Sequence, residues 1–343
     1  MNNFLKVSIV VCTYSHERYF DTIETIESLV KQSYQNIEII LVVDRNLNLF
    51  NDFIDSDFLK SLTDFKISFS NLLGLSNARN KGVELSSGDV IAFIDDDAIA
   101  DRDWISHLII CYKNPKVIGV GGPMKPLWIS GRVTWIPEEF YWTMGCSYKS
   151  QKNTIHSVRS NFGSNMSFRH AIFEEVGYFD DEFGLVGDKM RTGEETEFSI
   201  RALNKFNDSK IMYVPDAVVF HKIYKFRKSF AFLLKRCYGY GYAIANIGRS
   251  KKSIDDKLES TESNFLTHLL KSSFPERLKN IIFLKDVYTS ILNSIALVMF
   301  CTAVFAGFVC GNITSVVLSQ NYFADSKTFK SSIHDTITGD EKD

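Results

Sequence analysis

Proline is scarce in this sequence, and no two of its cysteines form a C-x-x-C pair. Only 6 of the 343 residues are proline, whereas 45% are hydrophobic and 23% are charged. This composition excludes a disordered chain and a collagen-like chain, and it is typical of a globular protein. The length predicts about two structural units, and a chain of this size buries a sizeable core without disulfide bonds.

The few cysteines are scattered along the chain. They are Cys12, Cys111, Cys146, Cys237, Cys301 and Cys310. Three of them lie inside apolar runs, so we expect buried free thiols in a reducing compartment. The N-terminal residues lead directly into a strand-like run, and we therefore expect no signal peptide.

A large net charge and several ligand-binding motifs are absent as well. The net charge is -2, which gives no support for nucleic-acid binding. No G-x-G-x-x-G follows the first strand-like run, and G-x-x-x-x-G-K-[ST], G-x-S-x-G and H-E-x-x-H do not occur. These absences exclude the dinucleotide site, the P-loop, the nucleophile elbow and the zinc site that the motifs encode.

Strand-like and helix-like patterns alternate over residues 1–125. The predicted strands are Val7–Thr13, Ile37–Val43, Phe65–Phe69, Val90–Ile94 and Val117–Val120, and the predicted helices are Glu17–Gln32, Ser76–Leu85 with Ser76 as N-cap, and Trp104–Tyr112. This alternation predicts an α/β fold with a parallel sheet and right-handed crossovers. Ligands of such sheets bind beyond the carboxyl ends of the strands, which is where Asp44 and Asp95–Asp97 fall.

Three consecutive carboxylates, Asp95, Asp96 and Asp97, follow the fourth predicted strand. On an extended chain Asp95 and Asp97 point to the same side. Clustered carboxylates repel each other unless a cation or hydrogen-bond donors neutralise them. Their hard oxygen ligands suit Mg²⁺ or Mn²⁺, which also bind substrate phosphates. The alternative is an acidic turn that caps the next helix.

Four further features could contribute to a site. Asp44 could accept a hydrogen bond from a base or ribose, or it could be an ordinary loop carboxylate. Arg79 could face a diphosphate or form a surface salt bridge. Three acids within Gly193–Glu197 mark a predicted helix start, where acids are common as caps. His221 is a lone histidine, which is more often structural than a ligand.

Charged residues are completely absent between Thr289 and Ala324. Within this run Ile295–Ile313 has about the twenty apolar residues that a bilayer core requires. A buried soluble helix is the alternative. Lysines and arginines flank the run and favour a cytoplasmic N-terminal side. They are Arg277, Lys279 and Lys285 before it, and Lys327 and Lys330 after it.

Residues 217–254 contain nine lysines or arginines and no acid, interleaved with phenylalanine and tyrosine. A solvated basic helix face is one interpretation. The interpretation that we favour is an interfacial segment on anionic lipid. No recognised motif supports nucleic acid as the partner.

Seven segments together resemble one family. They are Ser8–Tyr14 (SIVVCTY), Val42–Asp44 (VVD), Gly74–Gly82 (GLSNARNKG), Gly88–Asp97 (GDVIAFIDDD), Gly163–Arg169 (GSNMSFR), Gly193–Arg201 (GEETEFSIR) and Val218–His221. In this order, over residues 5–240, they resemble the inverting family 2 glycosyltransferases of the GT-A fold, which use nucleotide-diphosphate sugars. Each segment alone is weak evidence for this family, whereas all seven in this order are specific to it.

The resemblance implies a role for each matching residue. The nucleotide-sugar site would contain Asp44 at the nucleobase, Asp95 at the ribose, Thr13 and Asp96 beside them, Arg79 near the phosphates, and Asn165 at the sugar and acceptor. Asp97 would hold a divalent cation, Mn²⁺ or Mg²⁺, with His221 as a possible further ligand.

The pair Glu194-Glu195 matches the family's Glu-Asp motif, whose second residue is the usual general base. The resemblance therefore makes Glu195 the base and Glu194 its catalytic neighbour. A glutamate at this position adds one methylene to the side chain, which changes the geometry of proton transfer.

The processive synthases of the family carry a Q-x-x-R-W motif and several spans, and this sequence has neither. We therefore expect the addition of a single sugar. A catalytic domain followed by one apolar segment is similar to the archaeal enzymes that extend dolichyl-phosphate-linked glycans for protein N-glycosylation, in particular the glucuronosyltransferases that act on glucosyl-dolichyl phosphate. Three alternatives remain: an enzyme for another surface polysaccharide or glycolipid, a polyprenyl-phosphate monosaccharide synthase, and a non-catalytic membrane-tethered sugar-binding protein, against which Asp97 and Glu195 argue.

The sequence thus predicts a GT-A domain with a C-terminal membrane-associated helical region. Its parts are a nucleotide-sugar-binding half (1–125), an acceptor-side half (126–222), basic aromatic interfacial helices (223–285), an apolar transmembrane segment (286–324) and a polar tail (325–343). The expected partners are a UDP-sugar, a lipid-linked saccharide and the cell membrane, with no nucleic acid. We expect a single-pass protein with its catalytic domain on the cytoplasmic side.

Overall fold

The computed structural model describes residues 5–148, 153–181, 185–186, 189–190, 193–250 and 261–337. An eight-stranded sheet with the order β3-β2-β1-β4-β9-β6-β12-β8 forms the centre. Its strands are β1 (Val7–Thr13), β2 (Ile37–Asp44), β3 (Phe65–Ser70), β4 (Val90–Asp95), β6 (Val117–Gly121), β8 (His156–Val158), β9 (Met166–Arg169) and β12 (Lys210–Tyr213). The first four are parallel to one another, whereas β9 is antiparallel to both β4 and β6. The predicted mostly parallel α/β fold is confirmed.

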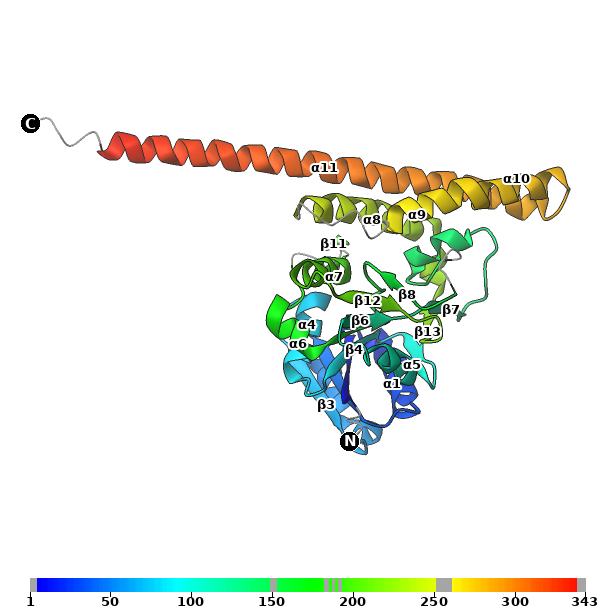
Figure 1. Ribbon diagram of the computed structural model, residues 1–343, viewed down its shortest axis with the longest axis vertical. Coiled ribbons are helices and arrows are strands. Elements are labelled where there is room, and N and C mark those ends of the chain that lie inside the picture. The colour runs from blue at the N-terminus through cyan, green and yellow to red at the C-terminus, as the bar shows by residue number, and fades with distance from the viewer. Residues whose placement is uncertain are drawn as a thin grey trace, which may run out of the picture.

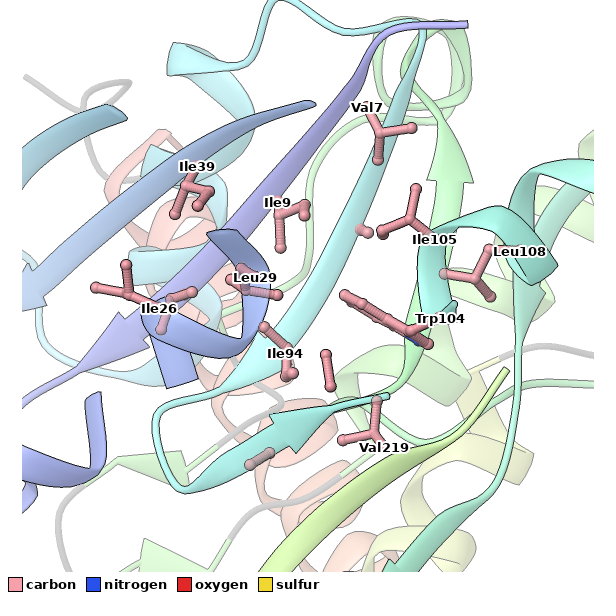
Figure 2. Packing of buried hydrophobic residues seen from close by; sticks show 14 of the residues in the cluster. Val7, Ile9, Ile26, Leu29, Ile39, Ile94, Trp104, Ile105, Leu108 and Val219 are labelled. Atoms are coloured by element: carbon pink, nitrogen blue, oxygen red, sulfur yellow. The ribbon is translucent and has the colours of Figure 1, made fainter. Parts of the chain in front are cut away.

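Helices cover both faces of this sheet. They are α1 (Tyr19–Val30), α2 (Leu47–Asp55), α3 (Asp57–Lys60), α4 (Leu75–Leu85), α5 (Trp104–Cys111), α6 (His170–Val176) and α7 (Glu194–Lys205). Side chains of β1 alternate between two cores: Ile9 packs with α1 and α5 (Figure 2), and Val10 packs with α4 and α7. Burial on both faces explains why these strands are continuous apolar runs.

The predicted helix borders differ from the observed ones at two places. Helix α4 begins at Leu75 with Gly74 as N-cap, so the predicted N-cap Ser76 is wrong. The chain enters this helix with a φ of 113° at Gly74, a conformation that glycine adopts readily. The predicted helix Glu17–Gln32 is a 3-10 turn, η1 (His16–Arg18), followed by α1.

A small second sheet positions the candidate site. It contains β5 (Ala98–Ala100), β13 (Val219–Ile223) and β7 (Met124–Trp128), with β13 in the middle. The antiparallel register of β13 and β5 pairs His221 with Ala98, so the histidine lies beside the residue that follows Asp97. A two-stranded ribbon, β10 (Leu185–Val186) and β11 (Lys189–Met190), lies before α7.

The C-terminal part of the chain is helical. Its elements are η3 (Lys225–Lys228), α8 (Phe230–Ser250), α9 (Thr261–His268), a π-helical turn (Leu269–Ser273), α10 (Phe274–Ile282) and α11 (Val287–Ile337). Helix α8 lies between the α/β domain and α11, and α11 extends beyond the domain (Figure 1). Residues 325–337 of the predicted polar tail continue α11 as a helix, and 338–343 lie outside the described residues.

The six cysteines form no disulfide, as expected, but only Cys146 and Cys237 are buried. Three others are half-buried, and Cys310 is exposed. The prediction that all six are buried is wrong.

A buried carboxylate at Glu38 joins β2 to its neighbours. It accepts hydrogen bonds from Ser8 Oγ and from the backbone N–H of Ser87, and Lys66 Nζ lies 2.9 Å from Oε2. Burial alone would raise the pKa of Glu38, but the donors on Ser8, Lys66 and Ser87 outweigh it and lower the pKa to about 2. The charged form therefore stabilises the fold.

Glu38→Gln is expected to lower the free energy of unfolding by about 2–3 kcal/mol at neutral pH, because hydrogen bonds to a charged group are lost. The difference should shrink as the pH falls from about 4.5 towards 2, where the folded carboxyl group takes up its proton. Urea unfolding followed by circular dichroism measures both effects. Glu84→Gln is the control, since its carboxyl is exposed and pairs only at the surface with Lys81. Equal losses in the two variants would contradict the assignment.

Candidate active site

A possible metal-ligand set lies at the carboxyl end of β4. Asp95 is the last residue of β4, Asp97 precedes β5, and β13 brings His221 alongside. One ligand atom from each of these three residues lies within 4.8 Å of the others. Two carboxylates and an imidazole are a donor set that suits Mn²⁺, and Mg²⁺ less well because of the nitrogen. The residues therefore fit a divalent cation.

Asp97 is the most strongly paired acid of the site. Arg18 Nη1 and Arg227 Nη2 each lie 2.8 Å from its Oδ2, and His221 Nε2 lies 3.2 Å from its Oδ1. Burial alone would raise the pKa of Asp97, but the neighbouring His221, Arg227 and Arg18 hold it well below its usual range. Asp97 therefore carries a negative charge beside the positive charges of Arg18 and Arg227.

His221 is buried, and its ring packs on a glycine. A Cβ at Gly145 would lie 3.0 Å from Cε1 of the imidazole, and Gly145 has a φ of 82°. Glycine at this position leaves room for the ring and permits the left-handed turn that ends η2 (Glu138–Met144). Nδ1 of His221 is buried and has no hydrogen-bond partner among the described residues.

Asp96, between the other two aspartates in the sequence, is buried. It is 8% exposed, and its Oδ2 has no hydrogen-bond partner in the described part of the chain. Burial and the charge of Asp97 raise the pKa of Asp96 to about 8, although a hydrogen bond from Thr13 opposes the shift. Thr13 itself is buried and also contacts the hydroxyl of Thr22 at 3.3 Å.

Arg79 joins the aspartates to the acidic pair on α7. Its Nη1 donates to Glu194 Oε1 at 2.7 Å, and its Nη2 lies 3.3 Å from Asp95 Oδ1. Nη2 also donates to the carbonyl oxygen of Gly163 at 3.1 Å, and a Cβ on this glycine would lie 2.9 Å from Nη2. The guanidinium is 3% exposed, so it holds both acids in a fixed relation.

Glu194 and Glu195 begin α7, as the sequence predicted, after Gly193 with a φ of 112°. Glu194 is buried and bound by Arg79, whereas Glu195 is half-buried. Burial and the adjacent charge of Glu194 raise the pKa of Glu195 to about 8. A carboxylate with a raised pKa is a stronger base than an ordinary one, and general bases work best near the operating pH.

Asp44 and Asn165 differ in what they can offer to a ligand. Asp44 ends β2 and accepts a hydrogen bond from the N–H of Gly74 at 3.0 Å, while its Oδ1 has no partner among the described residues. Burial raises the pKa of Asp44, against the effect of that amide. Asn165 is 0% exposed, and its side chain bonds Trp104 Nε1 and two backbone carbonyls. The amide of Asn165 is thus used inside the fold, and its place beside the sugar and acceptor stays a prediction.

Sequence reasoning missed three arginines at the site. Arg18 and Arg227 contact Asp97, and Nε of Arg227 is buried without a partner among the described residues. Arg236 on α8 is half-buried; burial and Arg227 lower its pKa, against the charges of Glu195 and Glu194. Arg227 and Arg236 belong to the basic stretch that predicted lipid contact. No local pattern separates these two residues from the rest of that stretch.

Comparison with known proteins gives a consistent result. The family model described as Glycosyl transferase family 2 matches residues 8–177. Glucosyl-dolichyl phosphate glucuronosyltransferase of Haloferax volcanii is 36% identical over 315 residues, which are 90% of this chain and 97% of that protein.

Two solved structures share the fold. The mannosyltransferase PcManGT from Pyrobaculum calidifontis, in complex with GDP-Man and Mn²⁺, has a TM-score of 0.58 at 14% identity, covering 91% of this chain and 88% of that chain. TarS 1–349 of S. aureus, in complex with UDP-GlcNAc, has a TM-score of 0.50 at 17% identity, covering 87% and 81%. Together with the near full-length identity to the Haloferax enzyme, these findings show that the chain belongs to glycosyl transferase family 2 and has its GT-A fold.

Proposed function

We propose that this glycosyltransferase moves one sugar from a UDP-sugar to a hydroxyl of a dolichyl-phosphate-linked saccharide, with inversion, in protein N-glycosylation. The observation that carries the proposal is the bridge made by Arg79, which contacts Asp95 of the metal-ligand set and Glu194 beside the base. The guanidinium of Arg79 thus lies between Asp95, which belongs to the residues suited to a metal-bound diphosphate, and Glu194, which lies beside the base suited to an acceptor hydroxyl.

The donor site lies at the carboxyl ends of β1, β2 and β4. Asp44 offers an unpartnered Oδ1 to the nucleobase, and Asp96 offers Oδ2 beside Thr13 to the nucleoside. The choice of a UDP-sugar is supported by the UDP-GlcNAc in the TarS structure and by the glucuronosyltransferase activity named for the Haloferax protein. The same name supports glucuronic acid as the sugar.

A divalent cation would be held by Asp95, Asp97 and His221, which fit it in distance and chemistry. When bound, such an ion neutralises the charge that builds up on the departing diphosphate. The Mn²⁺ in the Pyrobaculum structure supports the proposal. Arg18 and Arg227, both 2.8 Å from Asp97, place two further positive charges beside this position.

Glu195 is the proposed general base. It takes the proton from the acceptor hydroxyl as that oxygen attacks the anomeric carbon from the face opposite the diphosphate. Glu194 remains bound to Arg79 and so links α7 to α4. The neighbouring charge of Glu194 also maintains the raised pKa of Glu195.

The acceptor and the location follow from the C-terminal helices. The apolar helix α11 and the dolichyl-phosphate relative support a lipid-linked saccharide at a membrane. The lysines and arginines before the apolar run support the cytoplasmic side for the catalytic domain. A single pass is one of two arrangements open to α11, and a helix lying in the membrane surface is the other.

A panel of UDP-sugars incubated with synthetic glucosyl-dolichyl phosphate tests the substrate assignment. Mass spectrometry should show one added hexuronic acid from UDP-glucuronic acid and little product from the other donors. The parent acceptor without its glucose, dolichyl phosphate, should remain unmodified. Transfer to dolichyl phosphate itself would identify a monosaccharide synthase instead.

Gly145→Ala is expected to weaken Mn²⁺ binding by about tenfold or more, because a displaced supporting residue costs that much at metal sites. The new Cβ would press on the imidazole of His221, and the φ of 82° would be strained. Calorimetric titration with Mn²⁺ measures the change. Gly131→Ala is the matched control: Gly131 has a φ of 77°, and its Cβ would meet nothing within 4 Å. Equal weakening in both variants would exclude a specific role for the packing on His221.

A further inference from the structure

The first part of α11 packs along the catalytic domain. Ala296, Leu297 and Phe300 are buried against Phe140 of η2, and Asn293 Nδ2 donates to the carbonyl oxygen of Thr134 at 2.8 Å. These contacts are spread over about two turns of the helix. Figure 1 shows the first part of α11 passing over α8 and the domain, and the rest of the helix extending past them. One side of this apolar helix is therefore covered by protein over its first part.

Helix α8 runs beside α11 in the same direction. Three glycines allow the two helices to touch: a Cβ at Gly241 would overlap the carbonyl oxygen of Val304, a Cβ at Gly307 would overlap that of Tyr238, and Gly311 contacts Tyr242. The pairs advance together, from Tyr238 with Gly307 to Tyr242 with Gly311, so the helices are parallel. Close packing of this kind fixes α8 and α11 as one unit.

The opposite side of α11 is apolar and exposed. Ile295, Val298, Phe305 and Ile313 are 53%, 52%, 67% and 58% exposed. At the end of α10, Ile282, Phe283 and Leu284 are also exposed, at 65%, 63% and 83%. Large apolar side chains exposed in such number mark an interaction site. The partner that covers this surface must be wide and apolar. It must lie on the side of α11 away from the catalytic domain.

A membrane crossing by this helix conflicts with its packing. The parallel α8 carries Lys235, which is exposed, and Arg236. If Ile295–Ile313 crossed the bilayer, these charges and the flank of the catalytic domain that contacts Asn293 and Phe300 would enter the hydrocarbon. Charged side chains at that depth are costly. The contacts with α8 continue to Gly311, and the 13 charge-free residues that follow, 312–324, are too few for the roughly twenty that a span requires.

We propose that α10 and α11 lie in the plane of one leaflet, with the exposed apolar side of α11 in the acyl chains and α8 between this layer and the catalytic domain. Helices of this kind sink about 5–10 Å into the boundary of headgroups and acyl chains. The occupant of the apolar surface is thus lipid of a single leaflet, and no segment from Val287 to Ile337 crosses it.

This placement brings the active site to the level of the lipid headgroups. Arg227, which contacts Asp97, lies in η3 directly before α8. The charges of Glu195 and Glu194 reach Arg236 on α8. Among the described residues, α8 lies between α7, which carries the base, and the leaflet that would carry a lipid-linked acceptor (Figure 1). The placement itself does not depend on the sugar or the acceptor, so a crossing helix would leave the proposed transfer standing.

Cysteine labelling in sealed inside-out membrane vesicles from expressing cells tests the placement. The full-length protein carries Cys310→Ser, because that cysteine is exposed, and one new cysteine at either Lys113 or Lys327. Lys113 is exposed after α5 on the catalytic domain, and Lys327 follows the charge-free run in α11. A maleimide that cannot cross membranes is added before and after detergent, and the Cys310→Ser parent gives the background.

We expect both positions to react to the same extent before detergent, because both lie on one side of the membrane. Reaction of one position only after detergent would place them on opposite sides and overturn the inference. A fluorophore at Val298→Cys, Phe305→Cys or Ile313→Cys, quenched by lipids that carry nitroxides at known depths, gives a second reading. The three labels should lie at one shallow depth, and a helix that crosses would place Phe305 clearly deeper than the other two.

Discussion

Glu195→Gln is expected to lower kcat by at least about a hundredfold and to leave donor affinity nearly unchanged. A sugar hydroxyl attacks poorly until a base removes its proton, and such assistance contributes about 10²–10⁴-fold. Glutamine keeps the size of the side chain but cannot accept the proton. Initial rates with the lipid-linked acceptor, together with donor binding by calorimetry, measure the two quantities separately.

Glu197→Gln is the matched control for this variant. Glu197 lies in the same first turn of α7, but its carboxylate forms an ion pair with Arg201 at 2.8 Å. Its role is therefore structural. We expect a small change in kcat for the control. A loss below about fivefold in Glu195→Gln would remove Glu195 as the essential base. It would favour an anionic phosphate acceptor, which needs little help, or Glu194 as the base.

The same residue predicts a pH dependence. Because burial and Glu194 raise the pKa of Glu195 to about 8, the free enzyme holds its proton at lower pH. Therefore kcat/KM should increase as the pH rises through about 8 and then level off. This rise should be missing in the residual activity of Glu195→Gln. A flat profile in the parent enzyme would contradict the assignment of the raised pKa to the base.

Asp97→Asn is expected to reduce transfer by about a thousandfold or more, because the charge of the diphosphate is no longer balanced by a bound cation. The variant also leaves Arg18 and Arg227 without their shared carboxylate, which destabilises a buried site. The melting temperature of the variant must therefore be measured together with its rate of transfer.

Removal of the metal from the parent enzyme avoids this difficulty. EDTA should abolish transfer, and added Mn²⁺ or Mg²⁺ should restore it. The melting temperature measured in EDTA should show that the protein remains folded. Full activity in EDTA would exclude the proposed role of Asp95, Asp97 and His221 as cation ligands.

The central part of the fold and of the site follows from local sequence patterns. The strands that end in Asp44 and Asp95 are apolar runs buried on both faces, so their positions and the edge at which they end are predictable. The start of α7 at Glu194 is predictable because acids favour a helix N-terminus.

The remaining features depend on contacts between distant segments. The position of His221 beside Asp97 depends on the pairing of two short strands, β5 and β13. Arg227 reaches Asp97 across 130 residues of sequence, and nothing near Arg227 in the sequence indicates this partner. Asn165 is polar within a family motif, but the neighbours that bury it come from other segments.

The apolar helix illustrates the same limit. Composition predicts that Ile295–Ile313 meets lipid, and it cannot distinguish a helix that crosses from one that lies flat. That choice depends on what packs against the helix, and the glycine contacts with α8 are visible only in the fold.

The anomeric configuration of the product tests the central claim most directly. The parent enzyme is incubated with an α-linked UDP-sugar, glucosyl-dolichyl phosphate and Mn²⁺, and the product is examined by mass spectrometry and NMR. The structure and the family predict one added sugar, joined through a β-linkage to a hydroxyl of the acceptor glucose. An α-linkage, a polymer, or transfer to the phosphate would contradict it.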